Sequence, residues 1–401
     1  MSKPIADRST ERTAGLQCYQ VGGAVRDALL GLPVQDRDWV VVGSTPDDMI
    51  ARGFMAVGRD FPVFLHPETH EEYALARTER KSGQGYRGFV VHCAPDVTLE
   101  DDLLRRDLTV NAMALAPDGQ IIDPYGGQKD LASRLLRHVS PAFIEDPVRI
   151  LRVARFCARF GQFKVAPETL ELMRAMVDRG EVDALVPERI WQELSRGLMQ
   201  PHAPRMIDLL AACGAAQHIL PGLAPCWTAP DLPIALACTV DAQAALEVRW
   251  AVLLHRMSID EADALQDAVR APQACRDLAR LLIQYGSAML DGTSDPALAL
   301  TLLERCDALR KPERFAALLQ ALRCTQTAQG QAVPADKAAR VIGAWQEALV
   351  AARSVQAGPI AQAVATEPIA SRSDRIRAAV SEARCTAIAQ AWSKDTGSNR
   401  P

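Results

Sequence analysis

The ten cysteines of this 401-residue chain include no Cys-x-x-Cys pair and no zinc-finger spacing. Scattered cysteines of this kind are typical of reduced thiols in a cytoplasm, and they exclude a disulfide framework and a structural zinc site of the usual pattern. No apolar run approaches the ~18 residues of a membrane helix, and the first residues are too polar for a signal peptide. The sequence therefore predicts a soluble, cytoplasmic protein without membrane contact.

An excess of positive charge is also missing, since the net charge is −4. A non-specific nucleic-acid binder is usually basic, so any RNA contact must come from local clusters of arginine. No internal repeat is evident, which argues against a solenoid. The length predicts about two to three domains with apolar cores.

A pair of glycines, Gly22 and Gly23, follows the apolar segment 19–21 and precedes a helical pattern over 24–30. Glycines at a strand-to-helix turn let backbone N–H groups and the positive end of the helix approach a triphosphate. Arg26, one turn into the helix, adds a guanidinium that can bind phosphate oxygens. Taken alone, the Gly-Gly pair fits a plain tight turn equally well.

Two aspartates, Asp36 and Asp38, lead into residues 39–42, whose β-branched side chains predict a strand. Residues two apart on a strand point to the same face, so the two carboxylates repel each other unless a cation lies between them. This arrangement favours Mg²⁺ held together with substrate phosphates. The alternative is a polar strand start in which Asp36 caps a turn.

The stretch from Gly22 to Asp38 resembles the signature of the class II nucleotidyltransferases, the tRNA CCA-adding enzymes and bacterial poly(A) polymerases of the polymerase-β-like superfamily. The resemblance implies that Asp36 and Asp38 are catalytic and hold two Mg²⁺ ions, which activate an RNA 3′-hydroxyl and stabilise the leaving pyrophosphate. The matching residues are Gly22, Gly23, Arg26, Asp27, Gly31, Asp36 and Asp38.

Strand-like and helical segments alternate up to Pro141, and after it no convincing strand appears. With the resemblance, this predicts an α/β nucleotidyltransferase (polymerase-β-like) head followed by an all-α neck, body and tail. The predicted strands are 39–42, 61–65, 72–76, 89–93 and 120–123. The predicted parts are a loosely ordered N-terminus (1–15), the head (16–141), the neck (142–220), the body (221–330) and the tail (331–401).

Residues 105–107 resemble the Arg-Arg-Asp motif of the family. We expect Arg106 to bind the triphosphate or sugar, because a guanidinium between acidic neighbours is held at a fixed geometry. Asp107 is expected to cap the helix that follows.

A Gly- and Ser-containing loop over 77–88 carries cationic residues that can meet phosphates or simply face solvent. This segment resembles a flexible loop of the family, which helps the site change from adding C to adding A. Glu71 or Glu72 is a further candidate, as a third carboxylate of the metal site.

The segment 145–160 predicts a helix with Pro147 in its first turn and Asp146 as its N-cap. Arg149, Arg152 and Arg155 recur every three residues along one side. C and A both place an amino donor beside a ring-nitrogen acceptor, so an Asp-x-x-Arg pair can select them and exclude U and G.

The spacing fits the Glu-Asp-x-x-Arg motif of the family, and we assign base reading to Asp146 and Arg149. Arg152 and Arg155 are expected to contact phosphate, sugar or the base edge. In the alternative reading, Asp146 only caps the helix and the arginines only face solvent.

Some family members carry a His-Asp phosphohydrolase domain after the neck, but here Arg256 follows His255 where the Asp is expected. A lone His on a Leu-rich helix is most often packed or hydrogen-bonded, so we predict a degenerate body without metal or phosphohydrolase activity. The tail carries scattered cationic residues and is predicted to contact tRNA or to present a solvated face.

The resemblance favours template-independent addition of CCA to tRNA from CTP and ATP. A poly(A) polymerase of the same class would use the same aspartates and arginines. A catalytically silent RNA-binding protein and a phosphohydrolase are alternatives of other classes, which the Asp36-x-Asp38 pair and the missing His-Asp pair disfavour. Oligomeric state cannot be inferred.

Overall fold

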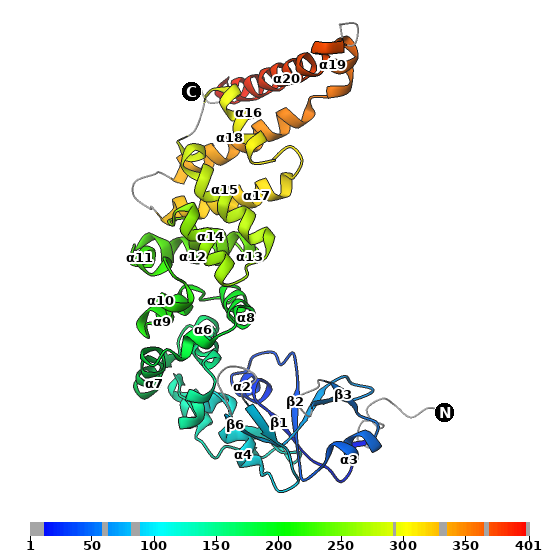
Figure 1. Cartoon of the computed structure of the whole chain (residues 1–401), viewed down its shortest axis with the longest axis vertical. Helices are drawn as coiled ribbons and strands as arrows, with labels where there is room; N and C mark the ends of the chain where they lie inside the picture. Colours follow the sequence, from blue (N-terminus) through cyan, green and yellow to red (C-terminus); the bar gives the residue numbers. More distant parts are fainter. Residues whose placement is uncertain are drawn as a thin grey trace, which may run out of the picture. The chain divides into compact units, whose positions relative to one another are not determined.

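A computed structural model of the chain describes residues 12–57, 63–81, 89–291, 294–328, 335–364 and 369–397. The chain divides into two compact units, Met1–Gly197 with Arg205–Ile219, and Leu198–Pro204 with Leu220–Pro401. The described part of the first unit contains a mixed sheet with helices, and that of the second is helical (Figure 1). Residues 1–11 of the predicted N-terminus, 61–62 of a predicted strand and 82–88 of the predicted loop lie outside the described residues.

The sheet of the first unit has seven strands in the described residues, in the order β3-β4-β5-β2-β1-β8-β9. At Asp38, β2 pairs antiparallel with β1 opposite Val21 and parallel with β5 opposite Glu72. The strands are β1 (Gln17–Val21), β2 (Asp38–Val42), β3 (Met55–Val57), β4 (Val63–Leu65), β5 (Glu72–Leu75), β8 (Ala114–Leu115) and β9 (Ile121–Ile122). A separate hairpin consists of β6 (Thr78–Lys81) and β7 (Phe89–His92).

Both faces of this sheet are buried, because successive residues of β2 point to opposite sides. Val40 packs into one apolar cluster with Leu103 of α4 (Leu99–Leu104). Val41 packs into the other with Met49 of α3 (Pro46–Ala51). A valine run without polar alternation is therefore what the central strand requires.

The rest of the first unit is mainly helical, as predicted, and several of its helices begin at a proline, which fits the first turn because it needs no N–H there. Its elements are α2 (Gly23–Leu29), η1 (Thr109–Asn111), α5 (Gly127–Ser133), η2 (Pro141–Glu145), α6 (Val148–Arg159), α7 (Pro167–Asp178), η3 (Glu181–Ala184), α8 (Pro187–Leu198), α9 (Pro204–Ala212) and α10 (Ala215–Ile219).

The prediction that no strand follows Pro141 is wrong in one place. Strand β11 (Lys164–Val165) pairs in parallel with β10 (Leu135–Leu136). The Lys164 N–H donates to the Arg134 carbonyl at 2.9 Å, and the Ala166 N–H donates to the Leu136 carbonyl at 3.0 Å. Two residues are too few for alternation to appear in a sequence, so only the tertiary pairing reveals this strand.

The described part of the second unit consists of helices around an aromatic and aliphatic core. Trp250 and Phe315 are fully buried, and the Trp345 indole donates to the Met289 carbonyl at 3.0 Å. In Figure 1, α18 and α20 pack side by side. The helices are α11 (Leu223–Trp227), α12 (Asp231–Asp241), α13 (Leu246–Leu254), α14 (Ile259–Ala268), α15 (Gln273–Leu290), α16 (Pro296–Arg305), α17 (Pro312–Ala328), α18 (Ala335–Ser354), α19 (Ala357–Val364) and α20 (Ile369–Gly397). A search of the described residues finds no helix with the length and apolarity to cross a membrane.

Candidate active site

The candidate site lies where β1 ends and β2 begins, because their pairing places Val21 opposite Asp38. The glycine turn and Asp38, the second carboxylate of the pair, therefore meet at one end of these two neighbouring strands. Gly22 has φ 70° and ψ −129°, a conformation that favours glycine. A Cβ at this position would stand 2.9 Å from Nη1 of Arg106. The backbone conformation requires glycine at position 22, and any larger residue would also displace the Arg106 guanidinium.

A cavity of about 520 Å³ adjoins this turn within the first unit. Nine arginines and three aspartates line it, so positive charge is concentrated here in a chain whose net charge is −4. The volume is that of a small-ligand site. The lining residues are Gly22, Gly23, Arg26, Asp38, Arg77, Arg105, Arg106, Asp107, Asn111, Asp146, Arg149, Arg152, Arg155, Phe156, Arg159 and Arg189.

Every residue predicted to bind the nucleotide therefore lines one cavity, together with Asp38, whereas Asp36 lies outside its lining. Both aspartates are exposed. Partial desolvation raises the pKa of Asp38, Arg106 opposes this shift, and the negative charge of Asp36 adds to it.

The residues present fit a divalent cation. Among the described residues, no hydrogen bond or ion pair holds the carboxylate of Asp36 or Asp38, so their oxygens can act as ligands. Partial desolvation is the main cause of the raised pKa of Asp38, and the charge of Asp36 adds to it; a cation between the two carboxylates would offset both effects. Carboxylate oxygens are hard ligands of the kind that Mg²⁺ prefers.

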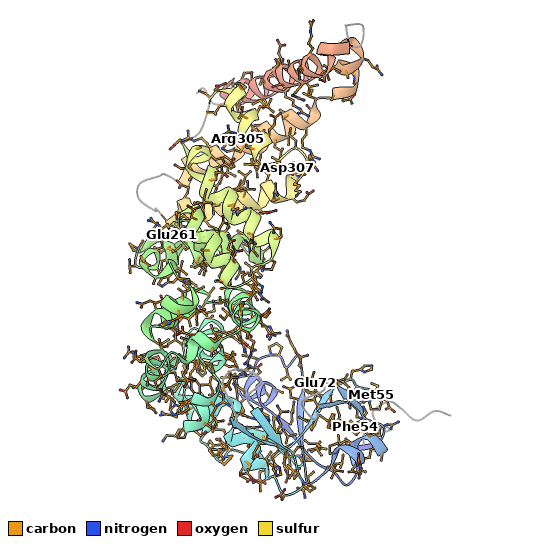
Figure 2. All side chains as sticks on the ribbon, viewed as in Figure 1. Phe54, Met55, Glu72, Glu261, Arg305 and Asp307 are labelled. Carbon is orange, nitrogen blue, oxygen red and sulfur yellow. The ribbon has the colours of Figure 1, made fainter. Side chains whose placement is uncertain are left out.

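The candidate third carboxylates differ in their surroundings. Glu71 accepts a hydrogen bond from the Trp39 indole at 2.9 Å and lies 3.9 Å from the Arg37 guanidinium. Glu72 is exposed on β5, in register with Asp38, and Figure 2 labels its side chain. Among the described residues, no group of three His, Cys, Asp or Glu side chains is placed to hold a metal ion.

Arg26 is buried, at 3% exposure, rather than projecting freely toward a ligand. Its Nε and Nη2 contact Asp27 at 2.9 Å, and its Nη1 donates to the Asn111 side chain. The guanidinium also lies 5.2 Å and 5.1 Å from the ring centroids of Phe156 and Phe160. Arg26 thus connects α2 to α6, and burial lowers its pKa despite the opposing charge of Asp27.

Arg106 is placed closer to the glycine turn. Its Nη2 donates to Asp102 at 3.1 Å, and its Nη1 donates to the Asn111 carbonyl at 3.4 Å. The Asp102 carboxylate, at 0% exposure, also accepts from Arg105. Burial by itself would raise the pKa of Asp102, but the two guanidinium groups lower it. The buried Nε of Arg106 has no hydrogen-bond partner in the protein, so a ligand that reaches this atom would satisfy it.

The prediction that Asp107 caps a following helix is wrong. Only the 3-10 turn η1 follows it, and the N-cap of that turn is Leu108, without a side-chain cap. Asp107 instead accepts hydrogen bonds from Asn111 at 3.0 Å and from Arg152 at 2.7 Å. Burial would raise its pKa, but the charge of Arg152 and these hydrogen bonds hold the pKa well below its ordinary value. Asp107 is a buried anchor for α6.

The arginines of α6 do not simply face solvent. Arg149 donates to the carbonyls of Ala142 at 2.8 Å and of Arg105 at 2.7 Å. Arg155 donates to Glu193 of α8 at 2.5 Å and lies over the Phe156 ring. The positive row is therefore held at the cavity by specific partners on neighbouring elements.

Asp146 has two roles in this structure. Its Oδ1 accepts from the N–H of Val148, the first residue of α6, at 3.1 Å. The N-cap position of α6 is Pro147, however, so the prediction of Asp146 as N-cap and Pro147 as first helical residue is off by one position. Both carboxylate oxygens also accept from Arg189 of α8, at 3.2 Å and 2.9 Å. The fork of Arg189 fixes the plane of the carboxylate.

Arg189 and Glu193 were missed from the sequence, although a signal was present. They stand four residues apart on α8 and pair with Asp146, just before α6, and with Arg155 on α6, which carry the opposite charges. A four-residue Arg-to-Glu spacing marks one face of a helix. The sequence could identify that face but not the helix that it meets.

In the second unit, the His255 ring lies 2.7 Å from the Val252 carbonyl, and Arg256 donates to Asp231 at 3.0 Å. Burial lowers the pKa of His255. Two of the tail cations have acidic neighbours: Arg377 lies 3.6 Å from Asp374, and Arg384 lies 3.7 Å from Glu304.

Comparison with known proteins places this site in a family. Residues 18–137 match the Poly A polymerase head domain, and residues 162–226 match the probable RNA and SrmB-binding site of polymerase A. The chain is 54% identical over 383 residues to the multifunctional CCA protein of Azoarcus sp. (strain BH72), covering 87% of this chain and 92% of that protein. It is 52% identical over 379 residues to the CCA-adding enzyme of Bordetella bronchiseptica, covering 94% of this chain and 97% of that enzyme.

A solved structure has the same fold. The CCA-adding enzyme of Bacillus stearothermophilus, in complex with CTP, superposes with a TM-score of 0.66 over 99% of this chain and 100% of that one, at 24% identity. Sheet, cavity and helical remainder define a nucleotidyltransferase with a polymerase-β-like head. The identity to these relatives, above one half over most of both chains, shows that the chain belongs to the family of CCA-adding enzymes and multifunctional CCA proteins.

Proposed function

We propose that this chain adds and repairs the 3′-terminal CCA of tRNA, using CTP and ATP without a nucleic-acid template and releasing pyrophosphate. The observation that carries the proposal is the convergence of nine arginines on a cavity that begins at Asp38 and the glycine turn. A triphosphate is the ligand class that such a concentration of guanidinium groups favours. Family membership supports tRNA as the acceptor.

In this proposal, the backbone around Gly23 and the side chain of Arg106 bind the triphosphate. The unpartnered Nε of Arg106 supports its role, because the phosphate chain offers acceptors that the protein does not. Arg26 acts mainly through its bonds to Asp27 and Asn111, which hold α2 against η1, and through its contact with the Phe156 ring of α6. Arg152 and Arg155 approach the nucleotide from α6, each steadied by a buried carboxylate.

Asp36 and Asp38 would hold Mg²⁺. When bound, the metal supplies charge neutralisation for the phosphates and activation of the RNA 3′-hydroxyl. The protein's part is to present two carboxylates beside an arginine-rich cavity, one of them in its lining. Arg106 favours ionisation of Asp38, since its charge opposes the desolvation that raises the pKa of this group.

Base choice is assigned to Asp146 and Arg149. Each oxygen of Asp146 has two acceptor sites, and its hydrogen bonds to Val148 and Arg189 leave capacity on Oδ2 for the amino group of C or A. Arg149 would share its donors between the base and the carbonyls of Ala142 and Arg105. Arg189 is a positioning residue in this scheme, because it fixes the carboxylate that reads the base.

Extension of a tRNA that lacks its 3′ end tests the proposal. With CTP and ATP together, the product should grow by C, C and A and then stop, whereas UTP or GTP alone should add little. Long A tracts from ATP would instead identify a poly(A) polymerase, which uses the same aspartates. Binding of tRNA without extension would identify a silent RNA-binding protein.

Two further assignments accompany this function. We propose that the second unit has no phosphohydrolase activity, which the Arg256–Asp231 pair and the packed His255 support. A cytoplasmic location is proposed as well, supported by ten cysteines that are free thiols in the structure.

A further inference from the structure

Two cysteines from distant parts of the sequence meet in the second unit. The Sγ atoms of Cys238 on α12 and Cys324 on α17 are 2.6 Å apart, although the residues are 86 positions apart in the chain. A disulfide bond is about 2.03–2.05 Å long, so these sulfurs are within a small movement of bonding distance. The two helices pack against each other, which holds the side chains in this relation.

The two thiols differ in access. Cys238 is half-buried, whereas Cys324 is fully buried. The hydrogen bond from Cys238 and the burial of Cys324 raise the pKa of Cys324 far above its ordinary value. A soluble oxidant therefore reaches Cys238 first, and Cys324 is the thiol that completes the reaction.

We propose that Cys238 and Cys324 are a reversible disulfide site, oxidised by a low-molecular-weight disulfide such as oxidised glutathione. The Cys238 thiolate attacks one sulfur of the small disulfide, forms a mixed disulfide and releases one small thiol. Cys324 then attacks Sγ of Cys238 and releases the second small thiol. Two protein thiols are oxidised, one small disulfide is reduced, and the two protons end on the two released thiols.

The bond would join α12 to α17 and enclose α13 to α16 in a covalent loop. Closing a long loop restricts the unfolded chain more than the folded one. Oxidation should therefore raise the melting temperature of the second unit, by about 5 °C. This inference does not depend on the proposed CCA-adding activity, because neither cysteine lines the candidate site.

Full-length protein would be equilibrated over a series of reduced-to-oxidised glutathione ratios and quenched with acid. The remaining thiols would be counted in denaturant by maleimide labelling and intact mass, with peptide mapping of any link. Wild type should lose two thiols and yield a peptide that joins Cys238 to Cys324. Melting would be followed calorimetrically on the reduced and oxidised forms.

Cys226→Ser is the matched control, because Cys226 is another half-buried cysteine of the same unit and donates to the Arg256 carbonyl rather than to a thiol. This variant should still form the link. Cys324→Ala should stop at one glutathione adduct on Cys238. Cys238→Ser, which changes a half-buried position and tests the site if Cys324→Ala fails to fold, should form no link.

Retention of all ten thiols in oxidised wild type, or a link between a different pair, would overturn the site. An unchanged melting temperature in the linked protein would overturn its stabilising effect.

Discussion

Three arginines of the candidate site and three of the second unit differ in the burial of their acidic partners. In the first unit, the partner carboxylates Asp102, Asp107 and Glu193 have side chains 0%, 5% and 6% exposed. In the second, Asp263, Asp277 and Asp267 are 21%, 32% and 68% exposed. Exposed ion pairs are screened by solvent and contribute little to stability, whereas buried ion pairs hold their side chains in a fixed geometry.

This difference explains why net charge was a poor guide to RNA chemistry. Arginines from α2, α6, α8 and the turn after α4 converge on one cavity, while those of the second unit are spread along helix surfaces. The electrostatic potential at a site depends on where the charges lie and on the local dielectric constant, and the net charge of the chain contains neither.

The most damaging change should be Asp38→Ala. Loss of a metal-binding carboxylate is expected to lower incorporation of both C and A by more than about a hundredfold. Single-turnover extension at saturating Mg²⁺ measures the effect, with tRNA affinity and melting temperature measured alongside and expected to stay nearly constant. Asp47→Ala, an exposed aspartate on α3, is the control and should remain active. Retention of a tenth of wild-type turnover by Asp38→Ala would contradict the assignment.

The second largest effect is expected for Asp107→Asn, which removes the buried anchor of α6. Breaking the pair with Arg152 should lower the free energy of unfolding by about 2–4 kcal/mol at pH 7, because it leaves a partly buried guanidinium without its counter-ion. The pKa of Asp107 is lowered in the folded protein, so its stabilising contribution is full above the unfolded value near ~4 and declines as pH falls below it. Urea unfolding should show the wild-type and variant midpoints converging on acidification.

A parallel pH dependence for wild type and Asp107→Asn would show that this carboxylate is not the responsible group.

A smaller effect, on base choice, is expected for Asp146→Ala. The loss of a charge-assisted hydrogen bond of roughly 1.5–3 kcal/mol should lower the C over U preference by about one to two powers of ten. Incorporation ratios for C, A, U and G would be measured with the melting temperature. If Asp146 served only as the helix cap, the protein would melt earlier with unchanged ratios.

Arg189→Gln sharpens this test, since it keeps Asp146 but removes the guanidinium that holds both its oxygens. It should shift the ratios in the same direction as Asp146→Ala.

Among exposed pairs, Asp263→Asn should change stability by less than about 1 kcal/mol. Arg280 contacts Asp263 at 2.7 Å, but the arginine side chain is 51% exposed. Urea unfolding under the conditions used for Asp107→Asn gives a direct comparison. An equal loss in the two variants would remove the distinction between buried and exposed pairs.

For His255→Ala we expect no change in phosphohydrolase activity. Wild type and variant should both leave 2′,3′-cyclic nucleotides and phosphate monoesters intact, with or without Ni²⁺. Metal-stimulated hydrolysis that disappears on His255→Ala would reveal an active centre in the second unit.

Much of the head could be predicted because its signals are local. The predicted strands near 39–42, 72–76 and 89–93 are confirmed within a residue or so, since each is mainly apolar and has neighbours in register. The resemblance to the class II nucleotidyltransferases is confirmed by relatives above half identity. The catalytic and nucleotide-binding assignments stay predictions, although the structure brings most of them to one cavity.

What the sequence determined by itself was therefore the family, the strand and helix types, and the residue kinds of the site. These depend on spacing along the chain, on glycines and prolines with restricted uses, and on periods of two and 3.6 residues. Only the tertiary structure decided that Arg26 is buried, that Asp107 anchors α6, and that Arg189 holds Asp146. Ion-pair partners more than 40 residues apart are selected by the packing of separate elements, and no local pattern in the chain specifies which helix another will meet.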